Sequence, residues 1–349
     1  METERPLIFD LDLDQLKELV LSWGEPAYRA KQIWQGIYCQ LWQTPQEFTP
    51  LPASLREKMA AELRFSGLTP AAVLKSSDHQ TVKTLFRLAD GRSIEAVLMR
   101  YEHRQTLCIS SQAGCAMGCA FCATGQMGFK RHLSSGEIVE QVMVYARQLK
   151  QEGKAVTNVV VMGMGEPFHN YANTLAAIDR LNHPDGFNLG ARRFTISTVG
   201  LVPMIRQFAL ERRQINLAIS LHASDDELRA SMMPVDKRYP IAELMQACRE
   251  YIDATKRRLT FEWALIQGVN DTPEQARALA HLLKGMLCHV NVIPLNPTHQ
   301  FSGTGSTRER AEAFRAELEK AGIPCTVRLR RGIDIQAGCG QLATEHAAD

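Results

Sequence analysis

The N-terminal segment of the chain carries apolar residues at the spacing of amphipathic helices. Leu16, Leu19 and Val20, for example, fall on one helical face. Prolines at positions 50 and 52 interrupt the pattern. Helices are therefore predicted near residues 14–23, 28–41 and 53–63. We expect residues 1–75 to form a small helical domain that resembles an RNA-binding module.

The apolar period changes to two over residues 81–100, which is typical of strands. The runs VKTLFRL and SIEAVLM flank Asp90 and Gly91, a pair that favours a two-residue hairpin turn. We therefore predict a β-hairpin over residues 76–103 that links the helical domain to the rest of the chain.

From Gln105 onward, apolar strand-like runs alternate with helix-like runs. The strand-like runs are QTLCIS, TNVVVMG, RFTISTV, INLAISL, LTFEWALI and HVNVIPL. Helices are predicted at residues 136–149, 171–181, 202–210, 241–254 and 273–283, and a helix at 308–321 and a strand at 325–329 follow. Apolar strands separated by helices imply a parallel sheet covered by helices. About six such units predict an α/β fold, a partial (β/α)6 TIM-like barrel.

The alternation defines a main body at residues 104–342, followed by a tail at 343–349. Ser134 and Glu137 have the Ser-x-x-Glu spacing of a capping box at the start of the first helix. In barrels of this kind the chemistry gathers at the carboxyl ends of the strands. Residues that directly follow each strand are therefore the first candidates for a functional site.

The composition changes this picture little. With 45% hydrophobic and 22% charged residues in 349, the chain has an ordinary globular mix. No apolar run is long enough to cross a bilayer, and the acidic N-terminus lacks the layout of a signal peptide. We therefore expect a cytoplasmic protein without membrane contact. A formal net charge of +2 disfavours nucleic-acid binding by bulk charge alone, although a local basic patch would suffice.

Three of the nine cysteines stand in the segment CAMGCAFC, directly after the first strand of the main body. Cys115, Cys119 and Cys122 at this spacing can bind three irons of a [4Fe–4S] cluster and leave the fourth iron open for S-adenosylmethionine (SAM). A structural zinc site needs four ligands, usually as two pairs, and no companion pair is present. The residues therefore predict an iron–sulfur cluster that can cleave SAM.

This cysteine loop resembles the radical-SAM signature, and a wider set of motifs resembles the RlmN-type family, the dual-specificity RNA adenine-C2 methyltransferases. The motifs span residues 95–342 and include CISSQAGCAMGCAFCATGQMGF, GMGEP, RRFTISTVG, LAISLHA, MMPV, NVIPLNP and GCGQL. The N-terminal helical segment also looks similar. The resemblance implies methylation of adenine carbon-2 in 23S rRNA and tRNA, with a [4Fe–4S] cluster and two SAM molecules per turnover.

Three other readings remain open from the residues. Related C8-methylating resistance enzymes of the Cfr type share most of these motifs, so adenine carbon-8 is an alternative target. Another radical-SAM activity, such as glycyl-radical activation, would not need a further pair of cysteines. A zinc or iron–sulfur binding module without catalysis is the third alternative.

The resemblance also implies a SAM pocket. Glycines in GMGEP let the backbone approach the methionine end of SAM, and Glu166 can accept a hydrogen bond from its ammonium. By resemblance the pocket is lined by Gly165, Glu166, Ser197, Ser220, Leu221, His222 and Asn296. Considered alone, His222 fits a core histidine equally well, and Asn296 fits a turn before a proline.

Two further cysteines and one glutamate are implied as catalytic residues. Cys339 lies between two glycines, a context that favours an accessible, nucleophilic thiol. By resemblance, Cys339 carries the methyl group and Cys108 resolves the intermediate through a transient disulfide. Glu95 is implied as the acceptor of the ring proton, and apolar neighbours suit a carboxylate to that role. The residues alone leave Cys108 a buried packing residue and Glu95 a surface residue.

The assignment of RNA as the substrate follows from the resemblance. The N-terminal segment offers Tyr28, Arg29, Lys31 and Trp34, which suit phosphate contact and base stacking but also suit a stabilising cap. The expected partners are 23S rRNA, tRNA and a reductant for the cluster and the disulfide. We expect the protein to be a monomer.

Overall fold

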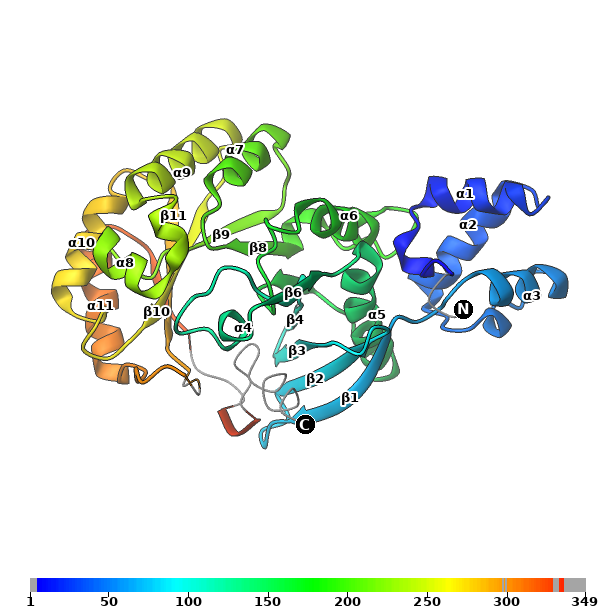
Figure 1. The fold of residues 1–349 in the computed structure, drawn as a ribbon, viewed down its shortest axis with the longest axis horizontal. Helices are drawn as coiled ribbons and strands as arrows, with labels where there is room; N and C mark the ends of the chain where they lie inside the picture. The colour runs from blue at the N-terminus through cyan, green and yellow to red at the C-terminus, as the bar shows by residue number, and fades with distance from the viewer. Residues whose placement is uncertain (1–4, 297, 299, 329–332, 336–349) are drawn as a thin grey trace.

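The computed structural model describes residues 5–296, 298, 300–328 and 333–335 (Figure 1). The chain begins with three helices, α1 (Leu13–Ser22), α2 (Tyr28–Gln35) and α3 (Ala53–Glu62), as the apolar spacing predicted. A capping box of Asp12 and Gln15 starts α1. Beyond α2 the chain makes one π-helical turn, Gly36–Gln40, and stops at Leu41, whose φ is 66°.

Trp34 lies at the centre of the helical segment rather than on its surface. Its side chain is 1% exposed and packs against the rings of Tyr38 and His183, with centroids 4.3 and 5.3 Å away. It is therefore a core residue and not a platform for base stacking. Tyr28 is exposed, and Lys31 pairs with Asp185 of the main body at 3.0 Å.

A ten-stranded sheet forms the main body, in the order β1-β2-β3-β4-β7-β8-β9-β10-β11-β12. The first part is an antiparallel meander of β1 (Leu68–Lys75), β2 (Thr81–Leu88), β3 (Ser93–Tyr101) and β4 (Arg104–Cys108). The predicted hairpin over 76–103 is present as β2 and β3, but it extends the main sheet instead of forming a separate link. Strand β1 falls within the range predicted to be helical, because Pro70 and two alanines obscure its strand pattern.

Within this ten-stranded sheet, every strand pair from β4 to β12 is parallel; β5 and β6 form a separate antiparallel pair. After β4 come β7 (Asn158–Val161), β8 (Phe194–Thr198), β9 (Asn216–Ser220), β10 (Leu259–Leu265), β11 (Cys288–Pro294) and β12 (Cys325–Val327). Among the described residues, β1 and β12 are the two edges of the sheet and do not pair with each other, so the barrel is open. This confirms the partial α/β barrel.

Helices cover the outer face of the parallel strands (Figure 1). They are α5 (Ser135–Gln151), α6 (Tyr171–Asn182), α7 (Val202–Glu211), α8 (Asp226–Met232), α9 (Ile241–Thr255), α10 (Pro273–Leu283) and α11 (Arg308–Lys320). All except the short α8 were predicted from the sequence. The capping box of Ser134 and Glu137 at the start of α5 is confirmed. Among the described residues, no helix has the length and apolarity that a bilayer crossing requires.

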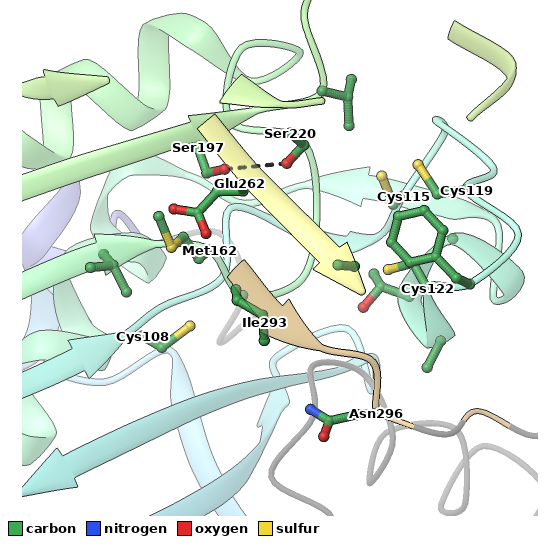
Figure 2. Close-up of a pocket in the computed structure, with 18 of the residues that line it drawn as sticks. Cys108, Cys115, Cys119, Cys122, Met162, Ser197, Ser220, Glu262, Ile293 and Asn296 are labelled. Carbon is green, nitrogen blue, oxygen red and sulfur yellow. Dashed lines mark hydrogen bonds between the residues drawn. The ribbon is translucent and has the colours of Figure 1, made fainter. Parts of the chain in front are cut away.

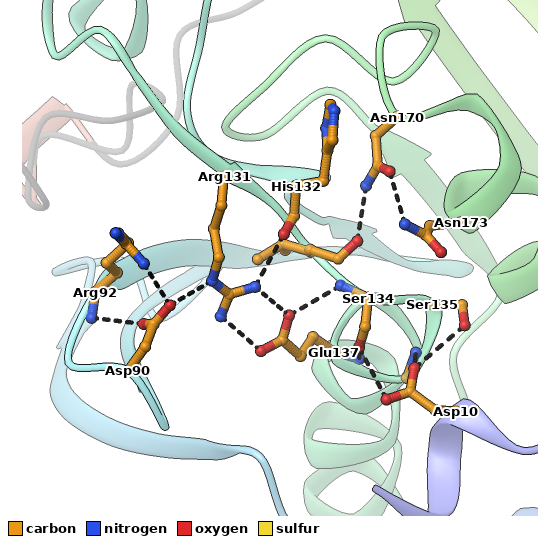
Figure 3. Close-up of polar contacts among 12 residues, drawn as sticks. Asp10, Asp90, Arg92, Arg131, His132, Ser134, Ser135, Glu137, Asn170 and Asn173 are labelled. Carbon is orange, nitrogen blue, oxygen red and sulfur yellow. Dashed lines mark hydrogen bonds and ion pairs between the residues drawn. The ribbon is translucent and has the colours of Figure 1, made fainter. Parts of the chain in front are cut away.

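The start of α5 is the junction between the helical segment and the main body (Figure 3). The Asp10 carboxylate accepts from the Gly136 N–H at 2.7 Å and from the hydroxyls of Ser134 and Ser135 at 3.1 and 3.3 Å. One contiguous apolar core runs through both parts and includes Val20 and Leu107. The two parts therefore pack as a single body.

The Asp10 contacts give a test of this junction. Asp10→Ala removes three hydrogen bonds to the start of α5, and we expect the free energy of unfolding to fall by about 1–3 kcal/mol. Urea denaturation measures the change. Asp253→Ala is the matched control, since this exposed carboxylate makes only a loose ion pair worth less than about 0.5 kcal/mol. Equal stability of the two variants would contradict the role of Asp10.

Candidate functional site

A cavity of about 410 Å³ lies at the carboxyl ends of the parallel strands, where the strand pattern led us to expect a site. Eleven of the residues singled out from the sequence line it: Glu95, Cys108, Cys115, Cys119, Cys122, Gly165, Glu166, Ser197, Ser220, His222 and Asn296. Leu221 is fully buried in the apolar core instead. Cys339 lies outside the described residues.

The cysteine loop is shaped by two short elements, β5 (Gln112–Gly114) before it and α4 (Ala123–Gln126) after it. Gly114 has a φ of +72°, and a Cβ there would lie 1.9 Å from the Gly128 carbonyl oxygen, so only glycine fits. The Gln126 side chain donates to the Ala120 carbonyl at 2.7 Å and holds the loop closed. Figure 2 shows the three cysteines gathered on one side of the cavity.

Burial raises the pKa of all three cysteine thiols, to about 12 for Cys115, and thiolate charges on Cys115 and Cys122 would raise that of Cys119 further. Thiolates at these positions therefore need a positive centre to bind them. Among the described residues, no three His, Cys, Asp or Glu side chains converge on a single metal ion. In a [4Fe–4S] cluster each thiolate would bind a different iron, so the three sulfur atoms need not converge on one metal ion. The three cysteines therefore fit such a cluster.

Glu166 joins three loops at the top of the barrel. Its carboxylate accepts from the Val199 N–H at 2.8 Å and the Phe168 N–H at 2.9 Å, and its own N–H donates to the Gln112 side chain at 2.8 Å. Burial raises the pKa of Glu166 to about 7, against the opposing effect of these hydrogen bonds. At Gly165, with a φ of +105°, a Cβ would lie 2.6 Å from Gln112. Only glycine therefore fits at this position, because its backbone packs directly against Gln112.

Polar residues at the carboxyl ends of β8 and β9 and just after β11 line the same cavity. The hydroxyls of Ser197 and Ser220 lie 3.5 Å apart, and Asn296 lies across the cavity from them (Figure 2). Leu221 is not part of this lining: its N–H donates to the Glu262 carbonyl at 3.2 Å, and its carbonyl accepts from Arg229 at 3.2 Å.

His222 is held in an unusual conformation. Its φ of 60° lies in the left-handed region, which is costly for a histidine. The Nδ1 atom accepts from the Ala264 N–H at 2.9 Å, so the proton of the neutral ring is on Nε2. The ring meets Phe121 edge to face at 5.0 Å. Burial, and the nearby Arg229, lower the pKa of His222 to about 3.

Cys108 lies on the wall of the cavity opposite the cluster loop (Figure 2). Burial raises the pKa of its thiol to about 11; Arg328 and Lys83 act to lower it, and Glu95 acts to raise it. At neutral pH the group is therefore a thiol that must lose its proton before it can act as a nucleophile. Cys108 faces the cavity, unlike a packing residue.

Glu95 is buried, not on the wet face of β3. It is 2% exposed and forms an ion pair with Lys83, whose Nζ lies 2.9 Å from Oε2. Lys83 was not singled out from the sequence, because its partner depends on the strand register. A second buried carboxylate, Glu262 on β10, was also missed. It accepts from Asn291 at 2.6 Å, and burial raises its pKa. A charged residue within the apolar run LTFEWALI was the available signal.

Two family models match the chain. One described as the radical SAM superfamily matches residues 109–283, and one described as the ribosomal RNA large subunit methyltransferase N-terminal domain matches residues 7–64. The first covers the barrel from the end of β4 to α10, and the second covers the three N-terminal helices.

Curated relatives match over nearly the whole length. A probable dual-specificity RNA methyltransferase RlmN from Chloroflexus aurantiacus is 51% identical over 99% of this chain and 94% of its own. The dual-specificity RNA methyltransferase RlmN 1 from Myxococcus xanthus is 49% identical over 96% of this chain and 93% of its own. A crystal structure of a radical SAM methyltransferase from Sphaerobacter thermophilus superimposes with a TM-score of 0.94 at 50% identity, covering 96% of this chain and 98% of that one.

The low pKa of His222 predicts how stability responds to acid. The unfolded chain binds a proton near the ordinary value of 6.5, whereas the folded protein binds it only near 3. The neutral His222 ring therefore adds to the free energy of unfolding in full above pH 6.5. This addition is lost as the pH falls below 6.5, and about 2 kcal/mol of it is gone at pH 5. Urea denaturation of the wild type and His222→Asn, which tolerates a left-handed φ, should show their stability difference shift by this amount between pH 7 and pH 5. A difference independent of pH would be inconsistent with a buried neutral ring.

Proposed function

Because the chain belongs to the RlmN family of radical SAM methyltransferases, we propose that it methylates carbon-2 of an adenosine in 23S rRNA and in tRNA. Family membership makes it a SAM-dependent RNA methyltransferase that uses a [4Fe–4S] cluster. The target atom, the two RNA substrates and the roles of individual residues are our proposal. One observation carries it: a single cavity is lined by the three cluster cysteines, by Cys108 and by Glu95.

The cofactors would bind where the barrel offers matching groups. A [4Fe–4S] cluster on Cys115, Cys119 and Cys122 supplies the electron that cleaves SAM. Glu166 and the backbone at Gly165 face the methionine end of SAM in this proposal. The hydroxyls of Ser197 and Ser220 and the side chains of His222 and Asn296 complete the SAM pocket, with Leu221 contributing backbone groups. All except Leu221 line the cavity.

The chemistry of the target explains why cysteine residues are required. An adenine carbon flanked by ring nitrogens has no lone pair with which to attack a methyl cation. In our proposal Cys339 first accepts a methyl group from one SAM, and a second SAM provides the radical that removes a hydrogen atom from this S-methyl group. The S-methylene carbon then adds to the base and joins Cys339 to the RNA. Two SAM molecules are therefore used in each turnover.

Release of the product uses the opposite wall of the cavity. The adduct gives up one electron, which the oxidised cluster would take back, and Glu95 accepts the ring proton, which leaves a thioether between the base and Cys339. Cys108, once deprotonated, attacks the Cys339 sulfur; the carbon–sulfur bond breaks and a disulfide forms. The freed carbon takes up one proton and becomes the methyl group. An external reductant then reopens the disulfide.

The direct test is an assay under anaerobic conditions. The protein is reconstituted with iron and sulfide and incubated with SAM, a reductant and unmethylated rRNA or tRNA. Mass spectrometry of the nucleosides should show 2-methyladenosine, and the peptide that contains Cys339 should gain one methyl group. Finding 8-methyladenosine would move the target to carbon-8. Finding 5′-deoxyadenosine without methylated RNA would refute the proposal and leave only SAM cleavage.

Replacement of Cys108 tests the release step separately. In Cys108→Ala the adduct between RNA and Cys339 has no nucleophile to break it, so we expect covalent RNA–protein conjugates to accumulate while methylated product falls by about 100-fold or more. Denaturing gels detect the conjugates. Cys39→Ala is the control, because Cys39 is exposed and lies in the N-terminal segment. Normal product formation by Cys108→Ala would rule out the resolving role.

A further inference from the structure

Lys83 and Glu95 form an ion pair that is almost completely removed from water. Lys83 is 0% exposed, Glu95 is 2% exposed, and the Nζ–Oε2 distance is 2.9 Å. Of the two, Glu95 lines the cavity. Both charges sit in strands whose remaining residues are largely apolar, since β2 reads TVKTLFRL and β3 reads SIEAVLMRY.

The strand register places this pair beside Cys108. Val97 of β3 stands opposite Lys83 of β2 on one side and opposite Cys108 of β4 on the other. Residues directly opposite share a face of the sheet, and so does Glu95, two positions before Val97. The four side chains therefore lie on one face of three adjacent strands. The electrostatic effects of both Lys83 and Glu95 on the Cys108 thiol agree with this placement.

Stability alone gives no reason for this pair. Removing two charges from water costs several kcal/mol each, and well-packed apolar residues in place of a buried pair are often equally or more stable. A charge pair at the wall of a reaction cavity has a clearer use. An ammonium at 2.9 Å fixes the direction in which the carboxylate points.

We propose that Lys83 is the positioning residue for Glu95, a role that rests on the function proposed above. The ion pair with Lys83 fixes the orientation of the Glu95 carboxylate at the wall of the cavity. When Glu95 accepts the ring proton, the electron pair of the carbon–hydrogen bond returns to the ring and the carboxylic acid stays hydrogen-bonded to Lys83. The same proton can then be given to the carbon that leaves Cys339. Glu95 therefore takes up one proton and returns one proton in each release of product.

The test separates proton removal from the earlier steps. Lys83→Met should leave SAM cleavage and methylation of Cys339 unchanged, because neither step uses Glu95. Release of methylated RNA should become about 10- to 100-fold slower, and covalent RNA–Cys339 conjugates should accumulate during turnover. Glu95→Gln should give the same pattern. Lys256→Met is the matched control, since Lys256 is an exposed lysine that forms a loose ion pair with Asp253 at 3.9 Å.

Two conservative variants separate charge from structure. Lys83→Arg keeps a cation beside Glu95 and should restore much of the release rate. Lys83→Gln keeps a hydrogen-bond donor but no charge, and should accumulate conjugates as Lys83→Met does. If Lys83→Met fails to fold, the comparison of these two variants carries the test, with SAM cleavage as the check of an intact barrel.

The outcomes distinguish the two proposals. If wild type forms 2-methyladenosine and Lys83→Gln releases product at the wild-type rate without conjugates, the role of Lys83 is wrong and the proposed function stands. If Lys83→Gln loses SAM cleavage, release and Cys339 methylation together, Lys83 serves the fold and the positioning role is also wrong. If wild type forms no methyladenosine, the proposed function itself fails.

Discussion

The arrangement of the site depends on the carboxylate of Glu166. It has no access to water, and its oxygens are used by N–H groups of its own loop and of the loop after β8. Through the Glu166 N–H and the Gln112 side chain, the same residue is tied to the strand that leads into the cysteine loop. Loops from three separate parts of the sequence are thus positioned by one buried group. A buried carboxylate satisfied by several donors is costly to replace, because each donor would lose its partner.

Arg229 has a comparable role one strand further along. Its fully buried guanidinium pairs with Asp236 at 2.7 Å and donates to the Val199 carbonyl at 2.7 Å and the Leu221 carbonyl at 3.2 Å. Glu166 and Arg229 therefore both hold Val199 in the loop after β8, Glu166 through the Val199 N–H and Arg229 through the Val199 carbonyl. These contacts fix the backbone around the cavity through the protein's own groups, which suits a site that must position reacting atoms closely.

Local patterns predicted most of this structure. The barrel alternation, the capping box at Ser134 and the cysteine loop are each encoded within a few consecutive residues, and all three are present. Features that depend on strand pairing were not accessible in this way. The ion pair of Lys83 with Glu95 follows from the β2–β3 register, and the burial of Trp34 follows from contact with His183, which is far away in the chain. Strand β1 was not predicted because Pro70 interrupts its strand pattern. Cys339 lies outside the described residues.

The antiparallel meander has a consequence for how the cavity is assembled during folding. Strands β2, β3 and β4 pair with their neighbours in sequence, so the wall that bears Glu95 and Cys108 forms from contacts of low sequence separation. The opposite wall requires β4 to pair with β7 across a long crossover, and each further strand adds to the one before it. Loop-closure entropy makes such pairings slower than hairpin contacts. The half of the cavity that bears Glu95 and Cys108 can thus form first from local contacts, and the parallel strands then add to its edge one after another.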